Sequence, residues 1–290
     1  GDKKDEDGST LYGLREWEKH EFKPREAYTF HERLYAIRYV DENGDRYYKE
    51  PSKEDLNRED KVIKLLLENF EVWQSNGYIP QIEIENGDTT SYLIKSRGWK
   101  YWFQLSNPRQ LIMNALLLKT IFSKSKDKSN LVIGALALNR VSDRNTKLCR
   151  WDSGSEKAQQ TFYNQAFNTL YNYVSRGWNA HKDNIKFDIN LNSYSDDSEY
   201  RIETEDARKV VSHCNIWITD PPYADAINYH ELTEFFLAWD KILLEKAFPE
   251  WYTDSKRVLA VKGIGQSFHE SMITKRNFWI LNSSFCMVVC

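Results

Sequence analysis

The chain has 290 residues, 41% of them hydrophobic, which is enough for one large or two ordinary domains with a sizeable core. Its formal net charge of −3 excludes a protein that attracts polyanions through its overall field, so any nucleic-acid contact would depend on local basic patches or another subunit. We find no signal-peptide pattern and no apolar run long enough to span a membrane. The four cysteines form no CxxC pair, which favours free thiols in a reducing cytoplasm over a zinc site.

A hairpin and a helix are the first predicted elements. Apolar and polar residues alternate over residues 32–50, and Asn43-Gly44 supplies a tight turn. Over residues 52–74 apolar residues recur every three or four positions, which predicts a helix with one buried face. Residues 81–105 are predicted to be loop with possible short strands. Their basic and aromatic cluster at 95–102 is typical of cations over buried rings, or of a nucleic-acid contact.

Three helices are predicted next. Asn107 is a capping residue with Pro108 at the first helical position, so a helix begins there and ends before a basic loop at 123–130. A second, apolar helix covers residues 131–141. A third is expected over about 155–174, where apolar residues again follow a helical spacing.

Basic and amide side chains are concentrated in residues 139–151, between the second and third predicted helices. Arg140, Asn145 and Arg150 could line a cleft that binds nucleic acid. The alternative is that these residues cap helices and carry surface charge, and their spacing alone slightly favours this second interpretation.

The most informative pattern is a buried strand, residues 214–220, that ends in Asp220-Pro221-Pro222-Tyr223. Proline cannot continue the ladder of a sheet, so the backbone turns away and leaves its carbonyl oxygens free. We expect these residues at the carboxyl edge of a sheet, where open α/β folds bind ligands. An apolar stripe from Leu232 onward predicts a packed helix directly after this turn.

The chemistry of this turn suits a planar base that carries an amino group. The Asp220 carboxylate and the Pro221 carbonyl would accept the two N–H bonds of an exocyclic amine, Pro222 would shape the turn, and Tyr223 would stack on the base. A duplex hides that amine, so the base would have to be flipped out. Asn228 and Tyr229 lie near the start of the following helix and could also touch the nucleic acid.

The segment "TDPPYADAINYHELTEFFLAWDKILL" resembles the motif region of large prokaryotic adenine-specific DNA methylases, including the class I methylase of DISARM-type phage defence. The blocks "ERLYAIRYV", "GYIP", "NPRQLI" and "ALALNRVSDRNTKLCRWDSGSEKAQQTF" are similar to the same family, so the resemblance covers most of residues 15–270. It implies an α/β fold with a Rossmann-like methyltransferase core, either complete or incomplete in this chain, plus helical insertions and an N-terminal β-hairpin.

The resemblance also implies S-adenosyl-L-methionine as cofactor, with Asp206 and Thr219 as candidate contacts, and DNA as partner. Such enzymes carry an FxGxG glycine loop, and the sequence has none; Gly263 and Gly265 follow the motif, whereas the family places its loop before it. We therefore expect the loop to lie in a missing segment or in a partner protein, or to have been lost. The first residue is not Met, which fits a fragment of a longer chain.

The expected organisation is a hairpin and helix segment over 1–105, a helical insertion over 106–178, and a methyltransferase core segment over 179–290. The predicted function is DNA adenine N6-methylation in restriction or phage defence, or the base-binding part of that activity. A catalytically incomplete DNA-binding or scaffold subunit of a defence complex is the main alternative. Methylation of cytosine N4 or of RNA is a further alternative.

Overall fold

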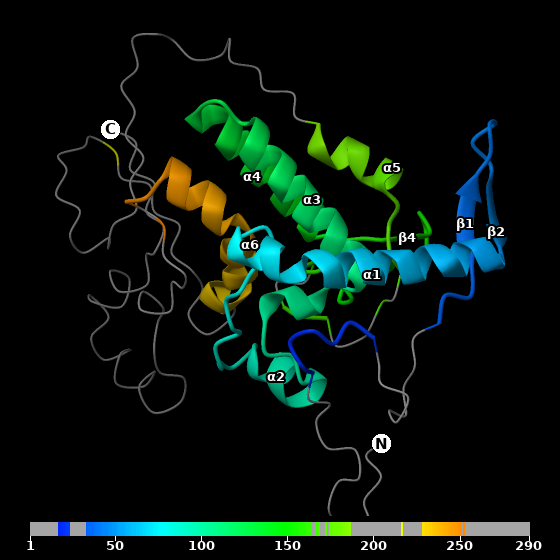
Figure 1. The fold of residues 1–290 in the computed structure, drawn as a ribbon, viewed down its shortest axis with the longest axis horizontal. Coiled ribbons are helices and arrows are strands. Elements are labelled where there is room, and N and C mark those ends of the chain that lie inside the picture. The colour runs from blue at the N-terminus through cyan, green and yellow to red at the C-terminus, as the bar shows by residue number, and fades with distance from the viewer. Residues whose placement is uncertain are drawn as a thin grey trace, which may run out of the picture.

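The computed structural model describes residues 17–23, 33–163, 166–168, 172, 174–186, 216, 228–250 and 252. These residues form a mixed α/β structure, about 51% helical, with small antiparallel sheets (Figure 1). The strand predicted over 214–220 lies outside the described residues, apart from Ile216. The Rossmann-like core therefore stays a prediction, since both sheets in the described part of the chain are two-stranded hairpins.

The predicted hairpin is confirmed by strands β1 (Ile37–Val40) and β2 (Arg46–Lys49), which pair antiparallel. The turn is stabilised by Asp41, whose carboxylate accepts hydrogen bonds from the backbone N–H groups of Asn43 and Asp45 at 2.9 and 2.8 Å. Gly44 has a φ of 89°, a conformation that side chains other than hydrogen disfavour. Asn-Gly turn chemistry thus sets this connection.

Helix α1 (Lys53–Ser75) confirms the second predicted element. Ser52 and Asp55 form a capping box that satisfies the first backbone donors. Leu66, Phe70 and Trp73 on the predicted stripe are buried, and the chain leaves the helix at Gly77 with a φ of 73°. The helical spacing of apolar residues was sufficient to predict α1, because one face of this helix packs on the core.

Residues 81–105 differ from the prediction of a loop with short strands. They contain helix α2 (Ser91–Arg97) and the 3₁₀ helix η1 (Trp102–Leu105), with one isolated bridge between Glu83 and Tyr101. A seven-residue helix is too short to give a clear periodic signal. Trp99 and Trp102 in the basic and aromatic cluster are fully buried, so this part of the chain uses its rings for packing.

Helices α3 (Pro108–Lys124) and α4 (Lys128–Ser142) confirm the next two predictions and lie side by side (Figure 1). Asn107 and Gln110 form the predicted capping box of α3. The connection is shorter than the predicted loop because Asp127 already caps α4. A Cβ atom on Gly134 would lie 2.2 Å from Cγ2 of Ile121, so the missing side chain allows the two helices to approach closely.

The helix expected over 155–174 is wrong for the described residues of that range. Strand β3 (Trp151–Asp152) pairs antiparallel with β4 (Lys157–Ala158), and backbone hydrogen bonds between Arg150 and residues 159 and 160 extend the pairing. The backbone donors here find cross-strand partners instead of helical ones. The apolar residues that mimic a helical stripe reach the core from an irregular segment, as the contact of Phe162 with Phe235 shows, with ring centroids 5.5 Å apart.

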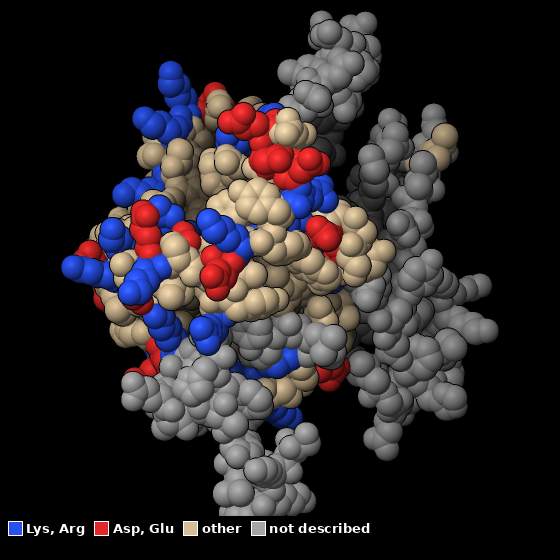
Figure 2. Space-filling view, turned by 90° about the vertical axis from the view of Figure 1, so that its right-hand side faces the viewer, with Lys and Arg blue, Asp and Glu red and all other residues tan. Residues whose placement is uncertain are grey.

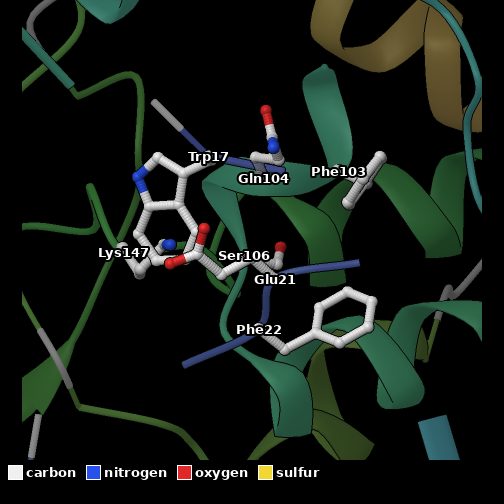
Figure 3. A pocket seen from close by; sticks show the side chains of 7 residues that line it. All are labelled: Trp17, Glu21, Phe22, Phe103, Gln104, Ser106 and Lys147. Atoms are coloured by element: carbon white, nitrogen blue, oxygen red, sulfur yellow. The ribbon is translucent and has the colours of Figure 1, made fainter. Parts of the chain in front are cut away.

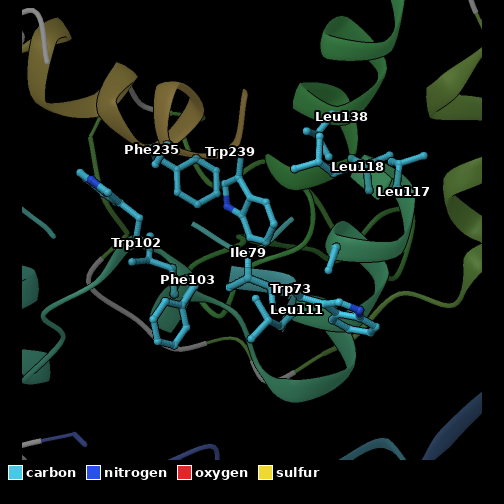
Figure 4. Packing of buried hydrophobic residues seen from close by; sticks show 14 of the residues in the cluster. Trp73, Ile79, Trp102, Phe103, Leu111, Leu117, Leu118, Leu138, Phe235 and Trp239 are labelled. Carbon is cyan, nitrogen blue, oxygen red and sulfur yellow. The ribbon is translucent and has the colours of Figure 1, made fainter. Parts of the chain in front are cut away.

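The last elements are α5 (Trp178–His181), the 3₁₀ helix η2 (Lys182–Ile185) and α6 (Tyr229–Ala247). Figure 4 shows Phe235 and Trp239 of α6 facing Ile79, Trp102 and Phe103 in the centre of the core. The described parts of all three predicted segments contribute to this one hydrophobic cluster. Its largest fully buried side chains are Trp99, Trp102 and Trp239.

Candidate functional site

The Asp220-Pro221-Pro222-Tyr223 motif lies outside the described residues, as do Asp206 and Thr219. The geometry of these residues therefore stays a prediction. Helix α6 is the nearest described element after the motif, and it begins a few residues beyond Tyr223. The contacts of α6 therefore fix the position of the chain from Asn228 onward.

Helix α6 packs on the core through the predicted apolar stripe. Leu232, Phe235, Trp239 and Leu243 are buried, and Phe236 is partly buried against them. Phe235 meets Trp102 edge to face, with ring centroids 6.2 Å apart. The prediction of a packed helix directly after the motif is thereby confirmed.

Glu231 anchors the first turn of α6 to a segment far away in the sequence. Its buried carboxylate accepts hydrogen bonds from the backbone N–H groups of Asp88, Thr89 and Thr90, at 2.9, 2.9 and 2.7 Å. The Thr90 hydroxyl lies 3.1 Å from the same carboxylate, but its single proton is closer to the Glu85 carbonyl, which lies 2.6 Å from the hydroxyl oxygen. Hydrogen bonds to a charged acceptor are the stronger kind, so this carboxylate fixes the start of α6 against the turn that precedes α2.

Asn228, predicted to touch nucleic acid, belongs to the same anchor. Its side-chain amide donates to the Thr89 hydroxyl over 3.1 Å. The backbone of Tyr229 opens α6, and its side chain lies outside what the structure describes. Together with Glu231, Asn228 fixes the start of α6 against the turn that precedes α2.

A second buried carboxyl group joins α6 to α4. Asp240 is 4% exposed, and its Oδ2 accepts a hydrogen bond from the Asn139 side-chain amide over 2.7 Å. Burial raises the pKa of Asp240 to about 8, although the bond from Asn139 acts in the opposite direction. At neutral pH this carboxyl group is therefore mainly protonated, and it joins the two helices as a neutral hydrogen-bonding group.

The three predicted nucleic-acid residues between α4 and β3 have different environments. Asn145 is fully buried, and its amide donates to the Gln110 carbonyl at 2.9 Å and to Asn114 Oδ1 at 2.8 Å. The prediction that Asn145 contacts nucleic acid is therefore wrong for this structure: the side chain has no exposed surface. Its amide instead satisfies polar groups inside the core.

Arg140 and Arg150 keep surface exposure, so a nucleic-acid contact remains a prediction for both. Arg140 is exposed and donates to the Lys186 carbonyl over 3.3 Å. The Arg150 guanidinium lies 4.0 Å from the centroid of the Tyr163 ring, and Tyr163 is 60% exposed. An exposed ring beside a guanidinium is the kind of surface on which an unpaired base can stack.

A small pocket lies on another part of the core, between residues 17–22, η1 and Lys147 (Figure 3). The Lys147 ammonium sits 4.7 Å from the centroid of the Trp17 ring and 4.8 Å from that of Trp99. Figure 3 shows the Glu21 side chain on the same side as Lys147. Because its cation is engaged by two indole rings, we interpret this pocket as a packing feature.

A scan of protein-family models, a search of curated proteins and a search of solved structures found no match to this chain. No helix among the described residues is both long enough and apolar enough to cross a membrane. The anchoring role of Glu231 is not predicted by the sequence pattern. No local signal could have found it, because the partners of Glu231 lie 141 to 143 positions earlier in the chain.

Proposed function

We propose that this chain is the target-base-binding part of a DNA adenine N6-methyltransferase that uses S-adenosyl-L-methionine. The single observation that carries the proposal is the sequence pattern, which predicts a buried strand that ends in Asp220-Pro221-Pro222-Tyr223, followed by the packed helix α6. The anchored start of α6 supports it, because a loop that must hold a flipped base in a fixed position needs a rigid attachment.

The chain's own residues would act on the amine of the base. The lone pair of the amine nitrogen is delocalised into the ring of the base, so this nitrogen is a poor nucleophile. Acceptors placed out of the ring plane, the Asp220 carboxylate and the Pro221 carbonyl, would draw the nitrogen towards a tetrahedral geometry and localise the pair. Tyr223 would hold the ring by stacking. The proton can leave after transfer, so Asp220 need not be a strong base.

S-adenosyl-L-methionine, when bound, would supply the electrophilic methyl group. The residues that the sequence offers to hold it, Asp206 and Thr219, lie outside the described part of the chain, and the sequence has no FxGxG loop. We therefore derive no step through the cofactor. We propose that a further segment or a partner protein completes its site, within a cytoplasmic restriction or phage-defence system.

The missing glycine loop also favours the second candidate, a methylase-derived subunit that binds DNA or scaffolds a defence complex without catalysis. Calorimetry with S-adenosyl-L-methionine separates the two, using the isolated chain and the chain with any protein that copurifies. Binding only with the partner supports a split enzyme. If neither preparation binds it, this polypeptide is not part of the enzyme.

The sharper test is methyl transfer from labelled cofactor to adenine-containing DNA. Asp220→Ala should abolish transfer, whereas Asp183→Ala should leave it unchanged, since Asp183 is a highly exposed acid, with 86% of its side chain accessible. Equal transfer by the Asp220 variant and the wild type would remove Asp220 from its role. Transfer to cytosine or to RNA in place of adenine would keep the chemistry and change the substrate.

A further inference from the structure

Three arginines and a histidine come together where residues 174–186 pass the end of α4. Asn172 donates its backbone N–H to the Lys147 carbonyl at 2.7 Å, and the Asn107 amide donates to the Ser175 hydroxyl at 2.6 Å. These bonds place Arg176 beside the loop that carries Arg144. His181 follows at the end of α5.

Arg176 is only 8% exposed, and two of its guanidinium nitrogens, Nε and Nη1, are buried without a hydrogen-bond partner. An unsatisfied buried donor costs about 1–3 kcal/mol, and more when it is charged. Burial lowers the pKa of Arg176, and the positive charges of Arg144 and Arg38 act in the same direction. The Arg176 guanidinium thus lies near other positive charges, and two of its hydrogen-bond donors have no partner.

His181 adds a neutral donor to the same place. It is fully buried, and its Nδ1 lies 3.5 Å from the side-chain nitrogen of Asn184, which can donate to it. The ring proton then resides on Nε2, which is buried and has no partner. Burial lowers the pKa of His181 to about 4, with Arg176 and Arg144 contributing, so the ring stays neutral near pH 7.

The acid nearest to these cations in the described structure is already engaged. Asp143 accepts hydrogen bonds from the backbone N–H groups of Thr161 and Phe162, at 3.1 and 3.3 Å, and its Oδ2 lies 3.8 Å from Arg144. Arg38 is held by the carbonyls of Ser155 and Glu156. Asp143 pairs with Arg144, whereas two guanidinium nitrogens of Arg176 are left without a partner, so the cluster keeps an excess of positive charge and of unused donors.

We propose that Arg176, Arg144 and His181 form a binding site for a phosphate group. Unused donors on both an arginine and a histidine call for an anion with several acceptor oxygens in a non-planar arrangement, which a phosphate has and a chloride ion lacks. The side chain of Arg144, 19% exposed, is the most accessible of the three, since Arg176 is 8% exposed and His181 is fully buried.

The source of the phosphate is either a nucleic-acid backbone or a small molecule such as inorganic phosphate. Lys and Arg side chains are interspersed with Asp and Glu on the side of the molecule that carries the β1–β2 hairpin (Figure 2). A phosphate would therefore be held by specific donors, not by a general positive surface. The nucleic-acid source rests on the proposed function; the site itself does not.

Calorimetric titration with inorganic phosphate, at an ionic strength held constant with chloride, tests the site in the full chain. We expect saturable binding that Arg176→Met weakens at least tenfold. Arg58→Met is the matched control, since Arg58 is a half-exposed arginine on α1 that pairs with Glu54 and Asp55. The Arg176 variant should fold at least as stably as the wild type without phosphate, because it loses an unpaired buried charge.

A second titration, with a short single-stranded oligonucleotide, identifies the source. Binding that Arg176→Met weakens and that inorganic phosphate competes away assigns the site to a nucleic-acid backbone. Binding of inorganic phosphate alone assigns it to small phosphorylated molecules. Should Arg176→Met not fold, Arg144→Gln takes its place, with the same expected weakening.

The proposal is overturned if neither ligand shows binding that depends on Arg176 or Arg144, or if the Arg58 variant loses as much affinity as theirs. Neither titration contains S-adenosyl-L-methionine or measures methyl transfer. Failure of the phosphate site and failure of the proposed methyltransferase function are therefore seen in separate experiments.

Discussion

Replacing Glu231 with glutamine tests whether the carboxylate fixes the start of α6. The wild-type Oε1 accepts one backbone N–H, from Asp88, and Oε2 accepts the N–H groups of Thr89 and Thr90. A glutamine side chain has the same shape but only one acceptor oxygen. Its best orientation keeps that oxygen at the Oε2 position and turns its NH₂ group towards the N–H of Asp88.

The magnitude follows from this count. The N–H of Asp88, whose hydrogen bond to Oε1 is part-buried, loses its partner at the lower end of the roughly 1–3 kcal/mol that a fully buried donor would cost, and the remaining bonds lose their charge assistance, worth roughly another 1 kcal/mol. We expect Glu231→Gln to lower the free energy of unfolding by about 2–3 kcal/mol. Since small domains are stable by only about 5–15 kcal/mol, a loss of this size is easily measured.

Urea unfolding followed by tryptophan fluorescence is the assay, because Trp99, Trp102 and Trp239 are fully buried and report directly on the core. Glu245→Gln provides the matched control. It is the same substitution on the same helix, but Glu245 is 47% exposed and lies 3.7 Å from Lys241 in a surface pair. Such a pair contributes about 0.3–0.5 kcal/mol. If the two variants lost equal stability, the anchoring role of Glu231 would be refuted.

Two further predictions concern the contacts of α4. The pKa of Asp240 is raised to about 8 in the folded state. Its contribution to the free energy of unfolding is therefore fully present below about pH 4 and is lost as the pH rises towards 8. Over this range the free energy of unfolding falls by up to about 1.4 kcal/mol per pH unit. Asp240→Asn cannot ionise and should remove this pH dependence. Thermal unfolding of the wild type and the variant at pH 5, 6.5 and 8 checks this. If the stability of both proteins changed with pH in parallel, the buried neutral state of Asp240 would be contradicted. Gly134→Ala should destabilise by about 1–3 kcal/mol because its methyl group would meet Ile121, whereas Gly177→Ala, where the added atom has open space, should not. A double variant with Ile121→Ala should recover part of the loss, and additive losses in a double-mutant cycle would mean that the two side chains do not meet.

The sequence by itself determined the local features of this protein. The capping boxes of Ser52 with Asp55 and of Asn107 with Gln110 are formed as their spacing predicts, and the Asn43-Gly44 turn closes the first hairpin. The stripe that includes Phe235 and Trp239 lies in the core. Such features depend on residues within a few positions of each other, so their physical cause is contained in the local sequence.

Only the tertiary structure decided which distant groups meet. Apolar spacing over 155–163 imitates a helix, yet the backbone there pairs across β3 and β4. Asn145 has the composition of a nucleic-acid contact but is buried against Gln110 and Asn114. The hydrogen bonds of Glu231 and the unused donors of Arg176 cannot be predicted from the residues next to them in the sequence. Periodicity tells which face of an element is buried, but polar partners far apart in the chain are chosen by packing, which brings them together only after the core has formed.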